Sequence, residues 1–163
     1  MSRPSEIRIE PATESDIPLV LTFIKGLAQY EGLADEVVAT EEGLRESLFG
    51  PQARAEAVIA YSLAEPVGFA VFFHNYSTFM GRSGLYLEDL FVLPEWRGRG
   101  LGRALLSYVA RVAVARNCGR LEWSVLDWNE PAINFYQSLG ARPMDEWTIY
   151  RLTGEALEQL SES

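Results

Sequence analysis

The residues best suited to binding chemistry lie in a glycine- and arginine-rich stretch at residues 94–103, which reads PEWRGRGLGR. A predicted strand leads into this stretch, and a predicted helix leaves it. Glycines let a backbone approach an anion closely, and the unpaired N–H groups at a helix N-terminus attract negative charge. Arg97, Arg99 and Arg103 add positive charge that matches a pyrophosphate. The stretch therefore predicts a phosphate-binding loop.

Neither of two common nucleotide-binding motifs fits this loop. A Walker A loop needs a Lys followed by Ser or Thr after its last glycine, and neither is present. A dinucleotide-binding fingerprint needs a third glycine at the position that Arg103 occupies, and it opens a leading βαβ unit, whereas this loop lies in the middle of the chain. The alternative interpretation is a glycine-rich turn that carries surface arginines.

Composition and charge exclude several other kinds of function. The 163 residues suit a single domain, residues 1–163, without repeats, low-complexity segments or an apolar run near the ~18 residues of a membrane span. The net charge of −9, from 14 basic and 23 acidic residues, is the opposite of what a nucleic-acid-binding protein shows. This acidity either attracts a cationic substrate or only keeps the protein in solution.

The single cysteine and the single histidine limit covalent and metal chemistry. Cys118 has no second cysteine for an intramolecular disulfide, which fits a reducing, cytoplasmic compartment, and residues 1–6 carry no apolar leader. With one histidine, His74, and no CxxC pair, we expect no metal. Cys118 lies in a turn far along the chain from the glycine-rich loop, so we do not expect an acetyl-cysteine mechanism.

The elements that must position these residues follow from the hydrophobic pattern. Helical spacing predicts helices that begin after Thr13 or Ser15 and at Thr40, followed by helices at 101–116, 131–139 and the C-terminus. Strand-like runs are found at 6–10, 55–63, 67–74, 85–93, 120–126 and 148–152, with a loop at 75–84. This order predicts a mixed α/β or α+β sheet and not a doubly wound parallel one.

Two motifs together resemble the GNAT superfamily of N-acetyltransferases. The first is Arg97-x-x-Gly100-x-Gly102 after a strand, and the second is Asn129 before a helix that carries Tyr136. Within the superfamily the chain resembles the diamine (spermidine/spermine) acetyltransferases and the thialysine N-ε-acetyltransferases. The segments that carry this closer resemblance are Ile7–Thr13, Tyr30-Glu31, Tyr86–Val92 and Asp127-Trp128-Asn129.

The resemblance implies a mixed, mostly antiparallel sheet that splays into a V between strands 85–93 and 120–126, with flanking helices. Acetyl-CoA is expected in the V as cosubstrate, with no metal. Backbone groups of Leu90, Phe91 and Val92 would pair with its pantetheine arm. The other residues that the resemblance places at the cofactor are Arg97, Gly98, Arg99, Gly100, Leu101, Gly102, Arg103, Asn129, Glu130, Pro131, Ala132 and Tyr136.

Acetyl transfer to an amine imposes three tasks, and the sequence offers a candidate for each. An ammonium must lose a proton, and Glu88 is the candidate base, acting through a water. Asp89 would point to the opposite face because strand side chains alternate, so the resemblance favours Glu88. The thioester oxygen needs a donor, which a backbone N–H beside Phe91 or Val92 can supply. Tyr136 would protonate the leaving thiolate, unless it is only a core residue of its helix.

Substrate recognition is expected to use acidic and aromatic side chains. Tyr30 and Glu31 match the subfamily's substrate segment, although Gly32 also explains them as a plain helix end. The further candidates are Glu88, Glu122, Trp123, Ser124 and Glu146. Residues 75–79 depart from the polyamine enzymes, which carry an Asp and a Trp there, and therefore favour a thialysine- or lysine-like amine.

Two other functions stay open at this point. A protein lysine or N-terminal acetyltransferase needs an open groove, which an occluding loop at residues 75–84 would obstruct. A non-catalytic CoA-binding sensory domain predicts loss of Tyr136 or Glu88, and both are present. The resemblance also implies a homodimer in which a C-terminal strand or arm engages the partner.

Overall fold

The computed structural model describes residues 6–163. The N-terminal stretch in which we expect no leader therefore lies almost entirely outside the described residues. The chain divides into two compact units, Met1–Ser124 and Val125–Ser163. Within residues 6–163, no helix combines the length and the apolar character needed to cross a membrane.

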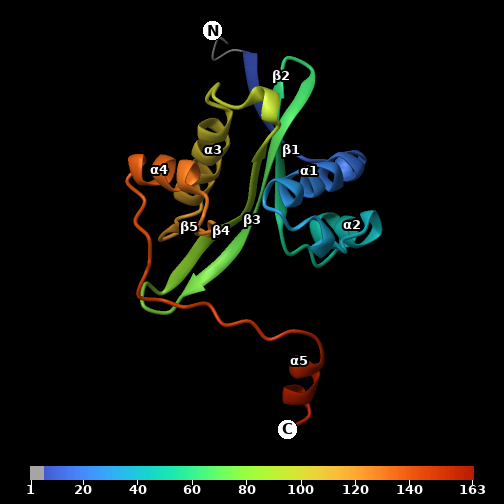
Figure 1. Cartoon of the computed structure of the whole chain (residues 1–163), viewed down its shortest axis with the longest axis vertical. Helices are drawn as coiled ribbons and strands as arrows, with labels where there is room; N and C mark the ends of the chain where they lie inside the picture. The colour runs from blue at the N-terminus through green and yellow to red at the C-terminus, as the bar shows by residue number, and fades with distance from the viewer. Residues whose placement is uncertain (1–5) are drawn as a thin grey trace. The chain divides into compact units, whose positions relative to one another are not determined.

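A five-stranded sheet forms the centre of the first unit (Figure 1). The first four strands run antiparallel to one another in sequence order, and the fifth runs parallel to the fourth. The strands are β1 (Ile7–Pro11), β2 (Glu56–Ser62), β3 (Glu65–Ser77), β4 (Arg82–Val92) and β5 (Leu121–Trp123). The predicted fold class, a mixed and mostly antiparallel sheet with flanking helices, is confirmed.

Helices cover both faces of this sheet (Figure 1). The first face carries α1 (Ile17–Tyr30) and α2 (Glu41–Phe49), and the second carries α3 (Leu101–Ala115). Three short 3-10 turns complete the unit: η2 (Glu14–Asp16), η3 (Ala34–Glu36) and η4 (Pro94–Trp96).

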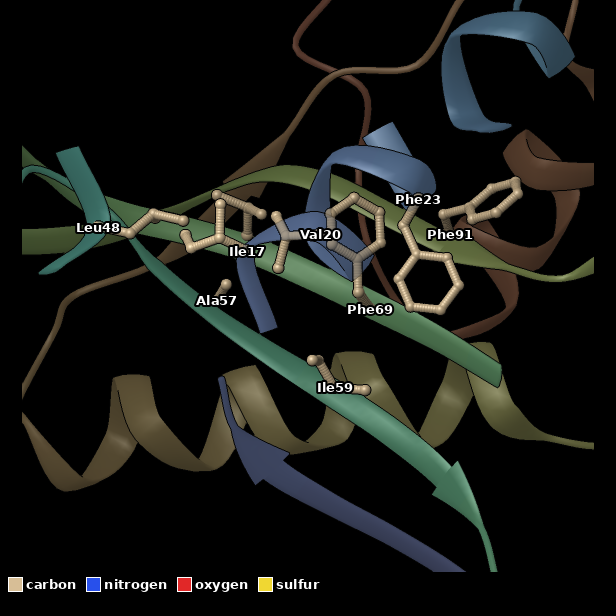
Figure 2. Packing of buried hydrophobic residues seen from close by; sticks show 9 residues of the cluster. Ile17, Val20, Phe23, Leu48, Ala57, Ile59, Phe69 and Phe91 are labelled. Atoms are coloured by element: carbon tan, nitrogen blue, oxygen red, sulfur yellow. The ribbon is translucent and has the colours of Figure 1, made fainter. Parts of the chain in front are cut away.

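The main core lies between α1 and the sheet. Figure 2 shows Phe23 of α1 beside Phe69 of β3 and Phe91 of β4; the ring centroids of Phe23 and Phe69 are 5.4 Å apart. Burying a side chain of this size stabilises the fold by about 1.5–3 kcal/mol. Gly26 of α1 lies so close that a Cβ there would stand 2.9 Å from the Phe91 ring. The packing therefore fixes the C-terminal half of α1 against the end of β4.

Local capping sets the ends of α1 and α2. Thr40 accepts a hydrogen bond from the Gly43 N–H at 3.0 Å, which confirms the predicted start of α2. The Gly32 and Leu33 N–H groups donate to carbonyls of the last turn of α1, and Gly32 has a φ of +73°. This is a Schellman ending, so the predicted stop at Gly32 is confirmed.

The expected loop at residues 75–84 is wrong, because most of it is strand. β3 extends to Ser77 and β4 begins at Arg82, which leaves only a tight turn at residues 78–81. The loop was predicted because this stretch is rich in the turn-forming residues Asn, Ser, Thr and Gly. The Asn75 amide donates to Glu122 of β5 at 3.2 Å, so a long-range contact stabilises the extended hairpin.

The second unit contains α4 (Glu130–Ser138) and α5 (Gly154–Ser161). The strand expected at 148–152 is wrong, because residues 141–153 are described without helix or strand. Ile149 and Tyr150 in this segment are 77% and 93% exposed. A strand-like sequence becomes a strand only when it pairs with a neighbour, and this segment has no ladder in the described chain.

Candidate active site

A β-bulge lies at the position of the candidate base. In the β3–β4 ladder, Val71 pairs with Asp89 and Phe72 pairs with Leu87, so Glu88 is an extra residue in β4. The expectation that Glu88 and Asp89 point to opposite faces assumed strict alternation, and the bulge breaks that alternation. Strand alternation therefore no longer separates the two carboxylates, and the preference for Glu88 rests on the family resemblance alone.

Three carboxylates form an acidic cluster here: Glu31 at the end of α1, and Glu88 and Asp89 in the bulge. Partial burial and the charges of Glu88 and Glu31 raise the pKa of Asp89 to about 7. Partial burial and the charge of Glu88 also raise the pKa of Glu31. Glu88 itself is exposed. Such a cluster attracts an ammonium group and offers it a proton acceptor.

The bulge also decides which backbone groups of β4 face the open edge of the sheet. Leu85 donates to the Arg120 carbonyl at 3.0 Å, so its N–H faces β5. Leu93 donates to the Val67 carbonyl of β3 at 2.9 Å. The backbone groups of Leu93 and Phe91 therefore point to β3, and those of Leu90 and Val92 point to the opposite edge of β4.

β5 pairs with β4 only along Leu85–Leu87. Beyond this point, no strand of the described first unit covers that edge of β4. Leu90 and Val92, two of the three residues expected at the pantetheine, therefore direct their backbone groups to this uncovered edge. Phe91 does not, because its backbone groups face β3 and its ring lies in the core.

The glycine-rich loop follows directly after this edge. Gly98 and Gly100 have φ values of +77° and +82°, and Gly100 is the N-cap of α3. A Cβ built at Gly98, Gly100 or Gly102 would meet no atom of the described chain within 4 Å. The space above the loop is therefore open, and the first N–H groups of Leu101, Gly102 and Arg103 have no partner within a helix. An anion fits this site.

The arginines of this loop differ in what they contact. The guanidinium of Arg99 lies 4.6 Å from the centroid of the Trp96 ring, within the loop itself. Arg97 lies 4.6 Å from the Tyr30 ring and 5.6 Å from the Phe91 ring, and its Nε donates to the Val92 carbonyl at 3.1 Å. Arg103 is exposed on the first turn of α3.

The candidates at residues 122–124 lie on β5 or directly after it, where the uncovered edge of β4 begins. Glu122 accepts from Asn75 and lies 3.3 Å from the Arg120 side chain, so its carboxylate is already engaged. Ser124 shares a hydrogen bond with Tyr86. Trp123 pairs with Leu87 in the ladder, directly before the bulge.

The remaining candidates lie in the second unit. Asn129 is buried and caps α4, accepting from the Ala132 N–H at 3.4 Å. Glu130 and Pro131 form the first turn of α4. The ring of Tyr136 lies 5.7 Å from that of Phe135 on the same helix. Glu146 is exposed in the segment between α4 and α5.

The sequence pattern disfavoured Asp89, which lies in the acidic cluster with Glu31 and Glu88. No local pattern marks a bulge, because it arises from how β4 pairs with β3. Within the described chain, no group of three or more His, Cys, Asp or Glu residues is arranged to hold a metal ion.

Comparisons with known proteins agree with this geometry. Residues 27–141, which run through both units, match the model of the Acetyltransferase (GNAT) family. The chain is 38% identical over 166 residues to a thialysine N-epsilon-acetyltransferase of Bos taurus, across 95% of this chain and 97% of the relative. It is 33% identical to an L-ornithine N5-acetyltransferase of Arabidopsis thaliana, across 94% and 87%.

A solved structure shares the fold of this chain. An integron cassette protein from the mobile metagenome of V. cholerae superposes with a TM-score of 0.80 at 29% identity, across 97% of this chain and 99% of that one. The chain therefore belongs to the GNAT family of acetyltransferases, and it is an N-acetyltransferase that transfers an acetyl group to an amine.

Proposed function

We propose that this protein transfers the acetyl group of acetyl-CoA directly to the terminal amine of a small, lysine-like amino acid in a ternary complex. The observation that carries this proposal is the acidic cluster of Glu31, Glu88 and Asp89 beside the open edge of β4. The cluster supplies negative potential for an ammonium at the point where an extended cosubstrate would end.

GNAT enzymes use acetyl-CoA as cosubstrate, and the residues of this chain fit it. The backbone of Leu90 and the Val92 N–H would pair with the pantetheine arm, since they face the open edge. The backbone of residues 98–103, with Arg99 and Arg103, would hold the pyrophosphate. The family resemblance alone assigns residues 129–132 and Tyr136 to the lower pantetheine and the sulfur.

The chemistry follows from these placements. Glu88, exposed in the bulge, would accept the ammonium proton through a water. The free amine then attacks the thioester carbon, while the Leu90 N–H stabilises the negative charge on the oxygen. The C–S bond breaks, the Tyr136 hydroxyl gives its proton to the departing thiolate, and the remaining extra proton of the acetylated nitrogen returns to the Tyr136 phenolate. A phenol has a reference pKa of about 10, so this transfer is nearly balanced.

The substrate class rests on charge and on the relatives. The names of the bovine and Arabidopsis relatives specify thialysine and L-ornithine, both amino acids with a terminal side-chain amine. In this chain, residues 75–79 bring no carboxylate that a longer polyamine could use. The loss of one partly exposed ion pair is worth roughly 1 kcal/mol or less, so we expect a preference over spermidine and not exclusion.

The test is a comparison of kcat/KM for thialysine, lysine, ornithine, putrescine, spermidine and a lysine-containing peptide at matched ionic strength. We expect one of the amino acids to lead. A tenfold or greater lead by spermidine would restore the polyamine assignment. A leading peptide would instead support protein acetylation, and binding of acetyl-CoA without turnover of any amine would support a sensory domain.

We propose a homodimer in a reducing, cytoplasmic compartment, which suits the single free cysteine, Cys118. The support for the dimer is the exposed, strand-like segment at residues 147–152, with Trp147, Ile149 and Tyr150 largely uncovered. Pairing of this segment on a second copy would cover these side chains. Light scattering should give twice the chain mass, and an Ile149→Asp, Tyr150→Asp variant should give a monomer. A monomeric wild-type protein would contradict this proposal.

A further inference from the structure

The side chain of Arg97 is held by three groups that lie outside its own loop. Its Nε donates to the Val92 carbonyl at 3.1 Å, and its guanidinium carbon lies 4.6 Å from the Tyr30 ring centroid and 5.6 Å from that of Phe91. Arg99, by contrast, lies over Trp96 of the loop itself. The charge of Arg97 is therefore directed to the end of α1 and not only toward the phosphate site.

The three partners of Arg97 belong to α1 and to the end of β4, the two elements that carry the acidic cluster of Glu31, Glu88 and Asp89. Tyr30 is adjacent to Glu31 at the end of α1, and Phe91 follows the bulge in β4. α1 packs closely against Phe91, since a Cβ built at Gly26 would stand only 2.9 Å from the Phe91 ring. Arg97 thus completes a cluster that joins the last turn of α1 to the last residues of β4.

We propose that Arg97 is a positioning residue for amine recognition. It fixes Tyr30, and with it Glu31, against the end of β4, while the backbone of the glycine-rich loop and the neighbouring arginines bind the pyrophosphate. This inference rests on the proposed function. It changes the role first expected for Arg97, which was a direct phosphate contact.

Lysine separates the two roles at this position. A lysine keeps a positive charge that can reach a phosphate, but it lacks the planar group that stacks on Tyr30 and the Nε–H that bonds to Val92. A phosphate contact therefore predicts that Arg97→Lys restores most of what Arg97→Ala loses. A positioning role predicts that Arg97→Lys behaves like Arg97→Ala.

The experiment measures coenzyme A affinity by calorimetry, and amine KM and kcat at saturating acetyl-CoA. For Arg97→Lys we expect coenzyme A affinity within about twofold of wild type and amine KM raised about five- to tenfold. Tyr30→Leu, which removes the ring, should raise amine KM similarly, and Tyr30→Phe should restore it. The double variant Arg97→Lys, Tyr30→Leu should be no worse than the more affected single variant.

Arg8 provides a matched control. It lies 4.7 Å from the Tyr61 ring and donates to the Leu63 carbonyl at 3.1 Å, at the far end of β1 and β2. Arg8→Lys should leave both coenzyme A affinity and amine KM unchanged, which separates loss of an arginine–tyrosine contact in general from loss of this one.

The results distinguish this inference from the proposed function. Reduced coenzyme A affinity with unchanged amine KM in Arg97→Ala, restored by Arg97→Lys, would overturn the positioning role and leave acetyl transfer intact. A wild-type enzyme that acetylates none of the amines would refute the proposed function instead. If Arg97→Lys unfolds, the Tyr30→Leu and Tyr30→Phe pair decides the question, because equal amine KM in those two variants also overturns the inference.

Discussion

Replacing Asp89 with Asn should stabilise the protein, and increasingly so as the pH rises. In the folded protein, burial and the charges of Glu88 and Glu31 raise the pKa of Asp89 from 3.8 to about 7. The fold therefore favours the protonated carboxyl, and this contribution is fully present below pH 3.8 and is lost as the pH rises through 7. Above neutrality the folded protein has to hold an ionised, partly buried carboxylate.

The magnitude follows from the same values. A shift of about three pKa units corresponds to about 4 kcal/mol once Asp89 is ionised in both states. At pH 5 Asp89 is ionised in the unfolded chain but still protonated in the folded protein. The loss of stability there corresponds to only about one pH unit, or roughly 1.5 kcal/mol. The stability difference between Asp89→Asn and wild type should therefore grow by up to about 3 kcal/mol between pH 5 and pH 9, and solvent screening makes this an upper figure.

The assay is urea unfolding of both proteins at pH 5, 7 and 9. Glu95→Gln is the control, since Glu95 is exposed on η4 and lies outside the acidic cluster. Its stability difference from wild type should stay flat over this range. A flat difference for Asp89→Asn as well would refute the view that the bulge places a destabilised carboxylate beside Glu31.

Three further predictions concern the loop, the acid and the fold. Gly102→Val should fold normally, because its Cβ meets nothing within 4 Å, yet it should lower acetyl-CoA affinity at least tenfold by filling the phosphate site; wild-type affinity in calorimetry would exclude that site. Tyr136→Phe should lower kcat by about 10- to 100-fold with coenzyme A affinity retained, and unchanged turnover would remove Tyr136 from the mechanism. Arg116 and Glu56 form a half-exposed ion pair through contacts of 2.6 and 2.8 Å, so Arg116→Ala should cost no more than about 1 kcal/mol of stability by urea unfolding. Because the hydrogen bond from Arg116 lowers the pKa of Glu56 from its ordinary 4.5, that contribution is fully present above pH 4.5 and is lost as the pH falls through the lowered pKa; a loss that grows as the pH falls would contradict it.

The features that the sequence predicted correctly are those set by local chemistry. The glycine-rich loop was predictable because positive φ values and a helix start need particular residues at fixed spacing, and Gly98 and Gly100 have such φ values. The end of α1 was predictable for the same reason, since Gly32 provides the left-handed residue of a Schellman ending.

The features that the sequence did not predict depend on contacts distant along the chain. The length of the β3–β4 hairpin depends on pairing that overrides turn-forming residues, such as the contact between Asn75 and Glu122. The segment at residues 148–152 has a strand-like composition but no ladder in the described chain, so composition alone was insufficient. The contacts of Arg97 depend on where α1 ends in space, which spacing within the loop does not report.

The bulge at Glu88 affects two parts of the proposed reaction, which are the backbone donor for the thioester oxygen and the carboxylates that would accept the amine proton. If Glu88 were instead an ordinary paired residue of a regular strand, the alternation that points Leu85 toward β5 would continue through Leu87 and Asp89 to Phe91. The edge would then offer the backbone of a core phenylalanine, and one acidic residue at most would share a face with Glu31. With the insertion, Leu90 presents its N–H to the open edge, directly beyond the two carboxylates. The donor for the thioester oxygen and the acceptor for the amine proton are thus placed by the same irregularity. Glu88→Gln removes the charge but leaves the backbone path unchanged, so this variant should lower kcat while coenzyme A affinity stays near that of the wild type.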